Sequence, residues 1–271
     1  MTRLEMGLGR GQGEGEVMAA GESGIHLCVF DLDHTLVRSD LDLDRMKRDV
    51  ASHLRRRGVG LAMGEPLPPI AELLRAAEVH DGRHGSRVAA EVWQIVAEHE
   101  RRALAAAREE PGARETLGAL RARGCWVAVW TNNASATAAE ALARAGLAGL
   151  VDVLVGRDDA GALKPAPDGF KVILDRLAAV AGCRHARRAG AVAARCHGDA
   201  GVARKRATER AIVIGDSWID GAAASAAGVR FVAFRTPASI FAARGVPVWR
   251  RVEHLAEVLH LPGMPAGSRC G

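Results

Sequence analysis

The chain of 271 residues contains no tyrosine, and aromatic residues of all kinds make up only 4% of it. Hydrophobic residues nevertheless make up 48%. We therefore expect a buried core that is packed mainly with Ala, Val and Leu. No apolar run approaches the ~20 residues that a helix needs to cross a bilayer, so the sequence predicts a soluble protein without a membrane partner.

Cysteine is also scarce. The five cysteines are an odd number, and the sequence shows no secretory signal. A disulfide framework is therefore not expected, and the composition favours a reduced, cytoplasmic protein. Two cysteines and two histidines lie close together at 183–197, but their spacing is not that of a zinc finger.

Acidic residues are nearly absent from residues 182–207. This segment holds seven basic residues against one acidic residue, Asp199, whereas the whole chain has a formal charge of only +5. We interpret 182–207 as a basic insertion loop within a larger domain. Two roles stay open for it: a solvated loop, or a contact for nucleic acid or another polyanion.

The two ends of the chain lack the patterns of regular structure. Residues 1–24 contain seven glycines and few large apolar side chains, so we expect a disordered N-terminus. No strand precedes these glycines, which argues against a phosphate-binding loop. Either Met1 or Met18 could be the true start. Residues 261–271 are expected to form a flexible tail.

Polar motifs follow three short apolar runs, at 25–30, 125–130 and 211–214, that predict buried strands. Because ligands bind at the carboxyl ends of parallel strands in open α/β sheets, these motifs predict one shared site. Further strands are expected at 151–155 and 229–234, and a helix at 134–145. The three motifs are Asp31-Leu-Asp33-His-Thr35, Thr131-Asn132 and Gly215-Asp216-Ser-Trp-Ile-Asp220. A further motif, Lys164-Pro165, lies between the second and third of these and does not directly follow a predicted strand.

The residue types in these motifs suit metal-assisted phosphoryl transfer. One carboxylate of the Asp31 and Asp33 pair can attack phosphorus while the other handles the proton of the leaving group, and we assign the second role to Asp33. Carboxylates gathered around a phosphate dianion need a hard divalent cation, which indicates Mg²⁺. The expected metal ligands are Asp31, Asp33 and Asp216, with Asp220 in support. The expected phosphate donors are Thr131, Asn132 and Lys164.

The interval between the first two motifs is much longer than one crossover helix requires, so it must hold an inserted domain. Apolar residues recur at helical spacing over 41–57 and again from Val88 to Leu104. Glycines and prolines punctuate the space between these two stretches. We therefore predict a doubly wound parallel α/β sheet, with a Rossmann-like core at 25–38 and 111–260 and a helical cap at 39–110.

In these motifs the chain resembles the haloacid dehalogenase superfamily. The resemblance implies that Asp31 is the nucleophile, that Asp33 is the general acid/base, and that Thr35 tightens the turn after the first strand. His34 stands where the family often has Gly, and Trp218 lies inside the fourth motif. Neither departure removes a reacting group.

The resemblance also assigns the remaining motif residues. Thr131 matches the phosphate-binding hydroxyl, and Lys164 matches the lysine that steadies nucleophile and phosphate. Asp216 and Asp220 match the acidic pair, of which Asp216 is the direct metal ligand.

The branch of the superfamily follows from Asp33 and the cap. Dehalogenases and phosphonate-cleaving members lack an aspartate at the position of Asp33. Its presence favours a phosphatase, and the helical cap with the 164–170 motif resembles the phosphoglycolate phosphatase-like subgroup. The expected activity is Mg²⁺-dependent hydrolysis of a small phosphorylated metabolite through an aspartyl-phosphate. Two alternatives stay open: a sugar-phosphate mutase of the same fold, and a catalytically silent protein that binds through the basic insertion.

Overall fold

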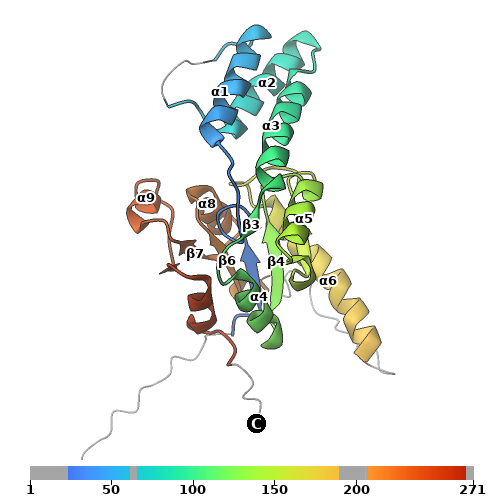
Figure 1. Cartoon of the computed structure of the whole chain (residues 1–271), viewed down its shortest axis with the longest axis vertical. Coiled ribbons are helices and arrows are strands. Elements are labelled where there is room, and N and C mark those ends of the chain that lie inside the picture. The colour runs from blue at the N-terminus through green and yellow to red at the C-terminus, as the bar shows by residue number, and fades with distance from the viewer. Residues whose placement is uncertain (1–23, 62–65, 189–204, 206, 267–271) are drawn as a thin grey trace, which may run out of the picture.

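The computed structural model describes residues 24–61, 66–188, 205 and 207–266 of the chain (Figure 1). Its centre is a sheet of six parallel strands in the order β5-β4-β1-β6-β7-β8. The strands are β1 (Leu27–Phe30), β4 (Trp126–Trp130), β5 (Val153–Val155), β6 (Ala211–Gly215), β7 (Arg230–Phe234) and β8 (Arg250–Val252). The first strand lies between β4 and β6, so the three strands that carry predicted motifs are neighbours.

Helices cover both faces of this sheet, because β1, β4 and β6 are apolar on both sides. One apolar cluster joins the sheet to α4 (Ala113–Ala122), α5 (Ser135–Arg144) and the 3₁₀ helices η1 (Ala148–Leu150) and η2 (Leu255–His260). The opposite cluster joins it to α6 (Asp168–Arg188), α8 (Trp218–Ala226) and α9 (Ala238–Ala242). The predicted doubly wound parallel sheet is confirmed. Among the described helices, none combines the length and apolarity that a bilayer span requires.

A helical insertion follows β1 and lies beyond one end of the sheet (Figure 1). It consists of α1 (Leu43–Arg56), α2 (Ile70–His84) and α3 (Val88–Ala105), which share an apolar core of their own. Its two connections to the sheet domain pair as short antiparallel strands, β2 (Val37–Arg38) and β3 (Arg108–Glu109). We refer to this insertion as the cap. The sequence predicted α1 and α3 but not α2, although Ile70, Leu73, Leu74 and Ala77 have helical spacing.

The described residues include parts of the expected insertion loop and of the expected tail. Helix α6 continues to Arg188, so the first residues of the segment 182–207 are helical, while 189–204 and 206 lie outside the described residues. The N-terminal segment 1–23 also lies outside them. At the other end, the backbone N–H of Ile25 donates to the Gly263 carbonyl over 2.6 Å, and Met264 packs against the core. The first residues of the expected tail are therefore attached to the sheet domain.

Candidate active site

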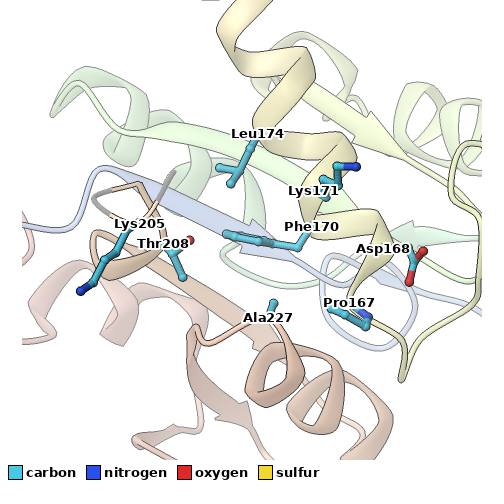
Figure 2. A pocket seen from close by; sticks show the side chains of 8 residues that line it. All are labelled: Pro167, Asp168, Phe170, Lys171, Leu174, Lys205, Thr208 and Ala227. Carbon is cyan, nitrogen blue, oxygen red and sulfur yellow. The ribbon is translucent and has the colours of Figure 1, made fainter. Parts of the chain in front are cut away.

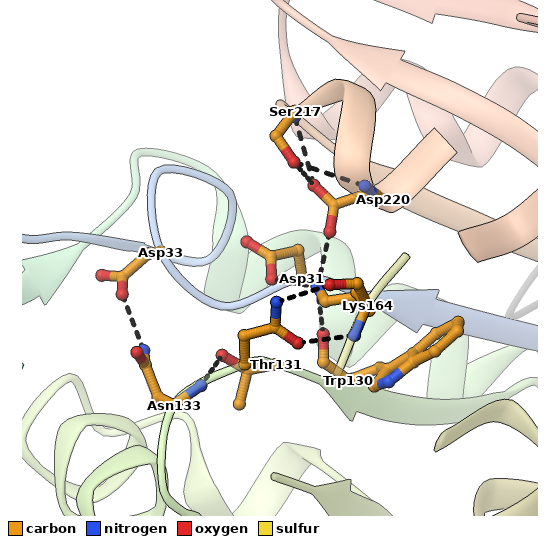
Figure 3. A network of polar contacts seen from close by, with 9 residues as sticks. Asp31, Asp33, Trp130, Thr131, Asn133, Lys164, Ser217 and Asp220 are labelled. Atoms are coloured by element: carbon orange, nitrogen blue, oxygen red, sulfur yellow. Dashed lines mark hydrogen bonds and ion pairs between the residues drawn. The ribbon is translucent and has the colours of Figure 1, made fainter. Parts of the chain in front are cut away.

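The carboxyl ends of β1, β4 and β6 bring predicted residues from all four motifs together (Figure 3). Asp31 follows β1, Thr131 follows β4, and Asp216 follows β6. Their strands are hydrogen-bonded neighbours, with Phe30 level with both Val129 and Ile214. The site therefore results from the strand order, because parallel strands present their carboxyl ends at one edge.

Lys164 is the central cation of this site. Its ammonium donates to Asp31 Oδ1 over 2.7 Å, to Asp220 Oδ1 over 2.5 Å and to the Trp130 carbonyl over 2.8 Å. The side chain is only 4% exposed. Asn132 holds the backbone of Lys164 from both sides, since its Oδ1 accepts from the Lys164 N–H and its Nδ2 donates to the Lys164 carbonyl. The Asn132 amide, expected to bind phosphate, thus contacts the lysine backbone.

Three carboxylates surround this lysine. Asp31, Asp216 and Asp220 each offer an oxygen, and these oxygens lie within 4.8 Å of one another. Asp220 is fixed most firmly, because its Oδ2 accepts from the backbone N–H and the hydroxyl of Ser217 in a capping box at the start of α8. Asp216 is partly exposed.

The electrostatics of the cluster show an excess of negative charge. Burial, together with Asp220 and Asp216, raises the pKa of Asp31 well above its usual range, against the opposing effect of Lys164. Burial and Asp220 raise the pKa of Asp216 to about 6. Burial disfavours the charged form of Lys164, but Asp220 and Asp31 outweigh it and raise the pKa of the lysine.

The donor set of this cluster fits a divalent cation. Its ligands are all carboxylate oxygens, which hard cations prefer, and Lys164 compensates only part of the negative charge. The cluster differs from the expected ligand set, because Asp220 takes part in it and the Asp33 carboxylate does not.

Asp33 lies beside the cluster and points toward the loop after β4 (Figure 3). Its Oδ2 accepts from Asn133 Nδ2 over 2.7 Å, whereas its Oδ1 is buried without a hydrogen-bond partner in the described structure. The Thr131 hydroxyl accepts from the Asn133 N–H over 3.1 Å. Thr35 is fully buried in the turn after β1, where Leu32 accepts from its backbone N–H.

Sequence reasoning missed several residues near the site. Asn133 directly follows the second motif and holds Asp33, and Ser217 inside the fourth motif caps Asp220. The position of Asn133 next to its motif, and of Ser217 inside its motif, was the only feature of the sequence that could have indicated a role in the site. Glu100 from α3 and Arg157 after β5 form a buried ion pair close by. No local pattern identifies these two, because their contact joins segments that are distant in sequence.

A cavity of about 370 Å³ lies away from this cluster, between α6 and α8 (Figure 2). Phe170 and Leu174 form its apolar wall, and Lys171 and Lys205 lie at its sides. None of its lining residues belongs to the acidic cluster. The candidate site is therefore defined by the strand ends and not by this cavity.

Gly215, the last residue of β6, allows Asp220 to approach the strand closely. A Cβ at Gly215 would lie 2.7 Å from the Cβ, Cγ and Oδ2 atoms of Asp220. We expect Gly215→Ala to displace Asp220 and to destabilise the protein by about 1–3 kcal/mol, as overpacking does. Thermal unfolding measures this effect.

Gly118→Ala is the matched control, because a Cβ there meets no atom within 4 Å in the interior of α4. This control should raise stability by about 0.5–1 kcal/mol. Equal melting temperatures for the two variants would contradict the close packing at Gly215.

The fold and the site define a class of protein that has an α/β core, a helical cap and a carboxylate-rich centre. The family model for haloacid dehalogenase-like hydrolases matches residues 25–228. The chain belongs to this family, and its insertion of three helices forms a cap. It is a phosphatase-like hydrolase.

Known proteins agree with this assignment. Over 261 residues the chain is 28% identical to a phosphoglycolate phosphatase of Rhodospirillum rubrum, covering 90% of this chain and 94% of the relative. A predicted phosphoglycolate phosphatase of Haemophilus somnus superposes with a TM-score of 0.54 at 22% identity, covering 89% and 99% of the two chains. CbbY of Rhodobacter sphaeroides, in complex with xylulose-(1,5)bisphosphate, superposes with a TM-score of 0.54 at 21% identity, covering 90% and 98%. The two structural neighbours share the fold with this chain.

Proposed function

We propose that this protein is a Mg²⁺-dependent phosphatase that hydrolyses a small phosphomonoester through an aspartyl-phosphate. The observation that carries the proposal is the contact of Lys164 with Asp31 and Asp220, with Asp216 beside them, at the carboxyl ends of three neighbouring strands. This arrangement joins a carboxylate nucleophile, a fixed cation and hard oxygen ligands in one place.

Asp31 is the proposed nucleophile. Its carboxylate attacks phosphorus, the bond from phosphorus to the ester oxygen breaks, and the leaving oxygen takes a proton from Asp33. The buried and unpartnered Oδ1 of Asp33 suits this transfer, because its other oxygen already accepts from Asn133. Water then attacks the acyl-phosphate and gives its proton to Asp33, which releases inorganic phosphate and restores Asp31.

Other residues stabilise the transferring phosphoryl group. Lys164 keeps Asp31 oriented, and its charge offsets the negative charge of the phosphate oxygens. The Thr131 hydroxyl donates to the same oxygens. A divalent cation, when held by Asp31 and Asp216 with Asp220 in support, supplies the positive charge that allows carboxylates and phosphate to meet.

The cap favours a small substrate. Its helix α3 reaches the sheet domain, where Glu100 pairs with Arg157, and Leu163, next to Lys164, packs against the core of the cap. A substrate has to fit between these two parts. The similarity to the Rhodospirillum rubrum enzyme makes 2-phosphoglycolate the first candidate.

A screen of phosphomonoesters with and without Mg²⁺ tests this function. We expect 2-phosphoglycolate, or an ester of similar size, to be hydrolysed with a kcat/KM at least about 10-fold above that of a phosphopeptide, because a closed cap excludes the larger substrate. Preference for the phosphopeptide would contradict the role given to the cap. Product analysis distinguishes the hydrolase from a mutase, because a hydrolase releases free phosphate and a mutase transfers the phosphoryl group to a second sugar hydroxyl.

A further inference from the structure

Asn133 makes two contacts that join the proposed acid/base to the loop after β4. Its side-chain amide donates to Asp33 Oδ2 over 2.7 Å, and its backbone N–H donates to the Thr131 hydroxyl over 3.1 Å. The residue itself is only 6% exposed. A buried amide with its donor directed at one carboxylate oxygen leaves the other oxygen, Oδ1, as the free one.

Arg157 holds the backbone of this loop. Its backbone N–H donates to the Asn133 carbonyl over 3.0 Å, and its side-chain Nη1 lies 3.4 Å from the Asn132 carbonyl. The same nitrogen donates to both carboxylate oxygens of Glu100, over 2.5 and 2.6 Å. The guanidinium also lies over the Trp93 ring, 4.5 Å from its centroid.

Glu100 and Trp93 belong to α3 of the cap, so these contacts connect the cap to the loop that carries Asn133. The side chains of Glu100 and Arg157 are 5% and 10% exposed. A buried ion pair usually stabilises a protein no more than packed apolar groups would. Here the pair keeps the guanidinium next to the Asn132 carbonyl, and the backbone N–H of Arg157 holds the adjacent Asn133 carbonyl.

We propose that Asn133 is a positioning residue for Asp33, and that the Glu100–Arg157 pair holds Asn133 in place when the cap rests on the sheet domain. This inference depends on the acid/base role of Asp33 in the proposed function. Asn133 holds Oδ2 of the carboxyl, so that Oδ1 stays available for the proton transfer, and the cap supports this step through residues that do not react themselves.

The test compares two substrates that differ in how strongly the leaving group needs a proton. Phenyl phosphate leaves as a basic phenolate, whereas 4-nitrophenyl phosphate leaves readily without protonation. We expect Asn133→Ala to lower kcat/KM for phenyl phosphate about 10-fold more than for 4-nitrophenyl phosphate, because misplaced acid/base catalysis affects only the poorer leaving group. Asp33→Asn should show the same selectivity more strongly.

Variants of the ion pair test the link to the cap. Arg157→Gln should show the same substrate selectivity, and its effect should not add to that of Asn133→Ala, since both act through one contact. The double variant Glu100→Leu with Arg157→Met removes the pair without leaving a buried charge, so it provides a folded protein for the same measurement. Arg144→Gln, which breaks an exposed pair with Glu140 on α5, is the control and should leave both rates unchanged.

The outcomes separate the inference from the function beneath it. If the unmodified protein with Mg²⁺ hydrolyses neither aryl phosphate, both the inference and the proposed function are wrong. Asp33→Asn could lower kcat/KM more for phenyl phosphate than for 4-nitrophenyl phosphate, while Asn133→Ala lowers both values equally or leaves both unchanged. In that case the positioning role of Asn133 is wrong and the proposed function stands. Selective loss in Asn133→Ala with strictly additive loss in Arg157→Gln would overturn the connection to the cap.

Discussion

Asp31→Asn should reduce turnover of any phosphomonoester by at least about 10³-fold, because an amide cannot form the acyl-phosphate through which the reaction proceeds. The fold should remain intact. Lys164 keeps its contact with Asp220, and the substitution removes a carboxylate whose ionisation burial already disfavours. Steady-state release of phosphate, with circular dichroism and thermal unfolding on the same preparation, measures both effects.

Asp44→Asn provides the matched control for this substitution. Asp44→Asn makes the same chemical change on α1, where the Asp44 side chain is 78% exposed, and this variant should leave turnover unaffected. If the Asp31→Asn variant kept a tenth of the normal rate, Asp31 would not be the nucleophile. Labelled phosphate should remain bound to the unmodified protein after acid quenching and should be absent from the Asp31→Asn variant. This comparison identifies the intermediate directly.

The fold could be predicted from the sequence because its strands are short apolar runs and its motifs follow them. The segments before Asp31, Thr131 and Asp216 became β1, β4 and β6, in adjacent positions. The prediction missed α2, whose start lies among prolines that suggested a loop, and the short strands β2, β3 and β8. Two- and three-residue strands depend on their pairing partners, which local sequence does not specify.

The site was predictable only to the level of its residue types. The residue types and the predicted strand ends indicate that Asp31, Lys164 and Asp216 share one site, but they do not indicate which oxygen atoms contact which partners. The structure adds Asp220 to the carboxylate cluster, places Asp33 with Asn133, and turns Asn132 toward the backbone of Lys164. The contact between Glu100 and Arg157 spans 57 positions in the chain, so only the folded arrangement reveals it.

Removal of divalent cations should abolish catalysis, and Mg²⁺ should restore it. The cluster of Asp31, Asp216 and Asp220 has Lys164 as its contacting cation among the described residues, which leaves it short of positive charge before a phosphate dianion enters. Treatment with EDTA, removal of the chelator and titration with Mg²⁺ test this expectation. Full activity in excess EDTA would contradict the metal site.

Mg²⁺ should also stabilise the protein when no substrate is present. A ligand that binds only the folded state at 100 times its Kd adds about 2.7 kcal/mol, which corresponds to roughly 5 °C in Tm for a chain of this size. Burial raises the pKa of Asp216 to about 6, so protons compete with the cation below that pH, and the stabilisation should be larger at pH 7.5 than at pH 5. Asp216→Asn should lose most of the Mg²⁺-dependent shift, while Asp44→Asn should keep it. A shift that is the same in both variants would place the cation outside the carboxylate cluster.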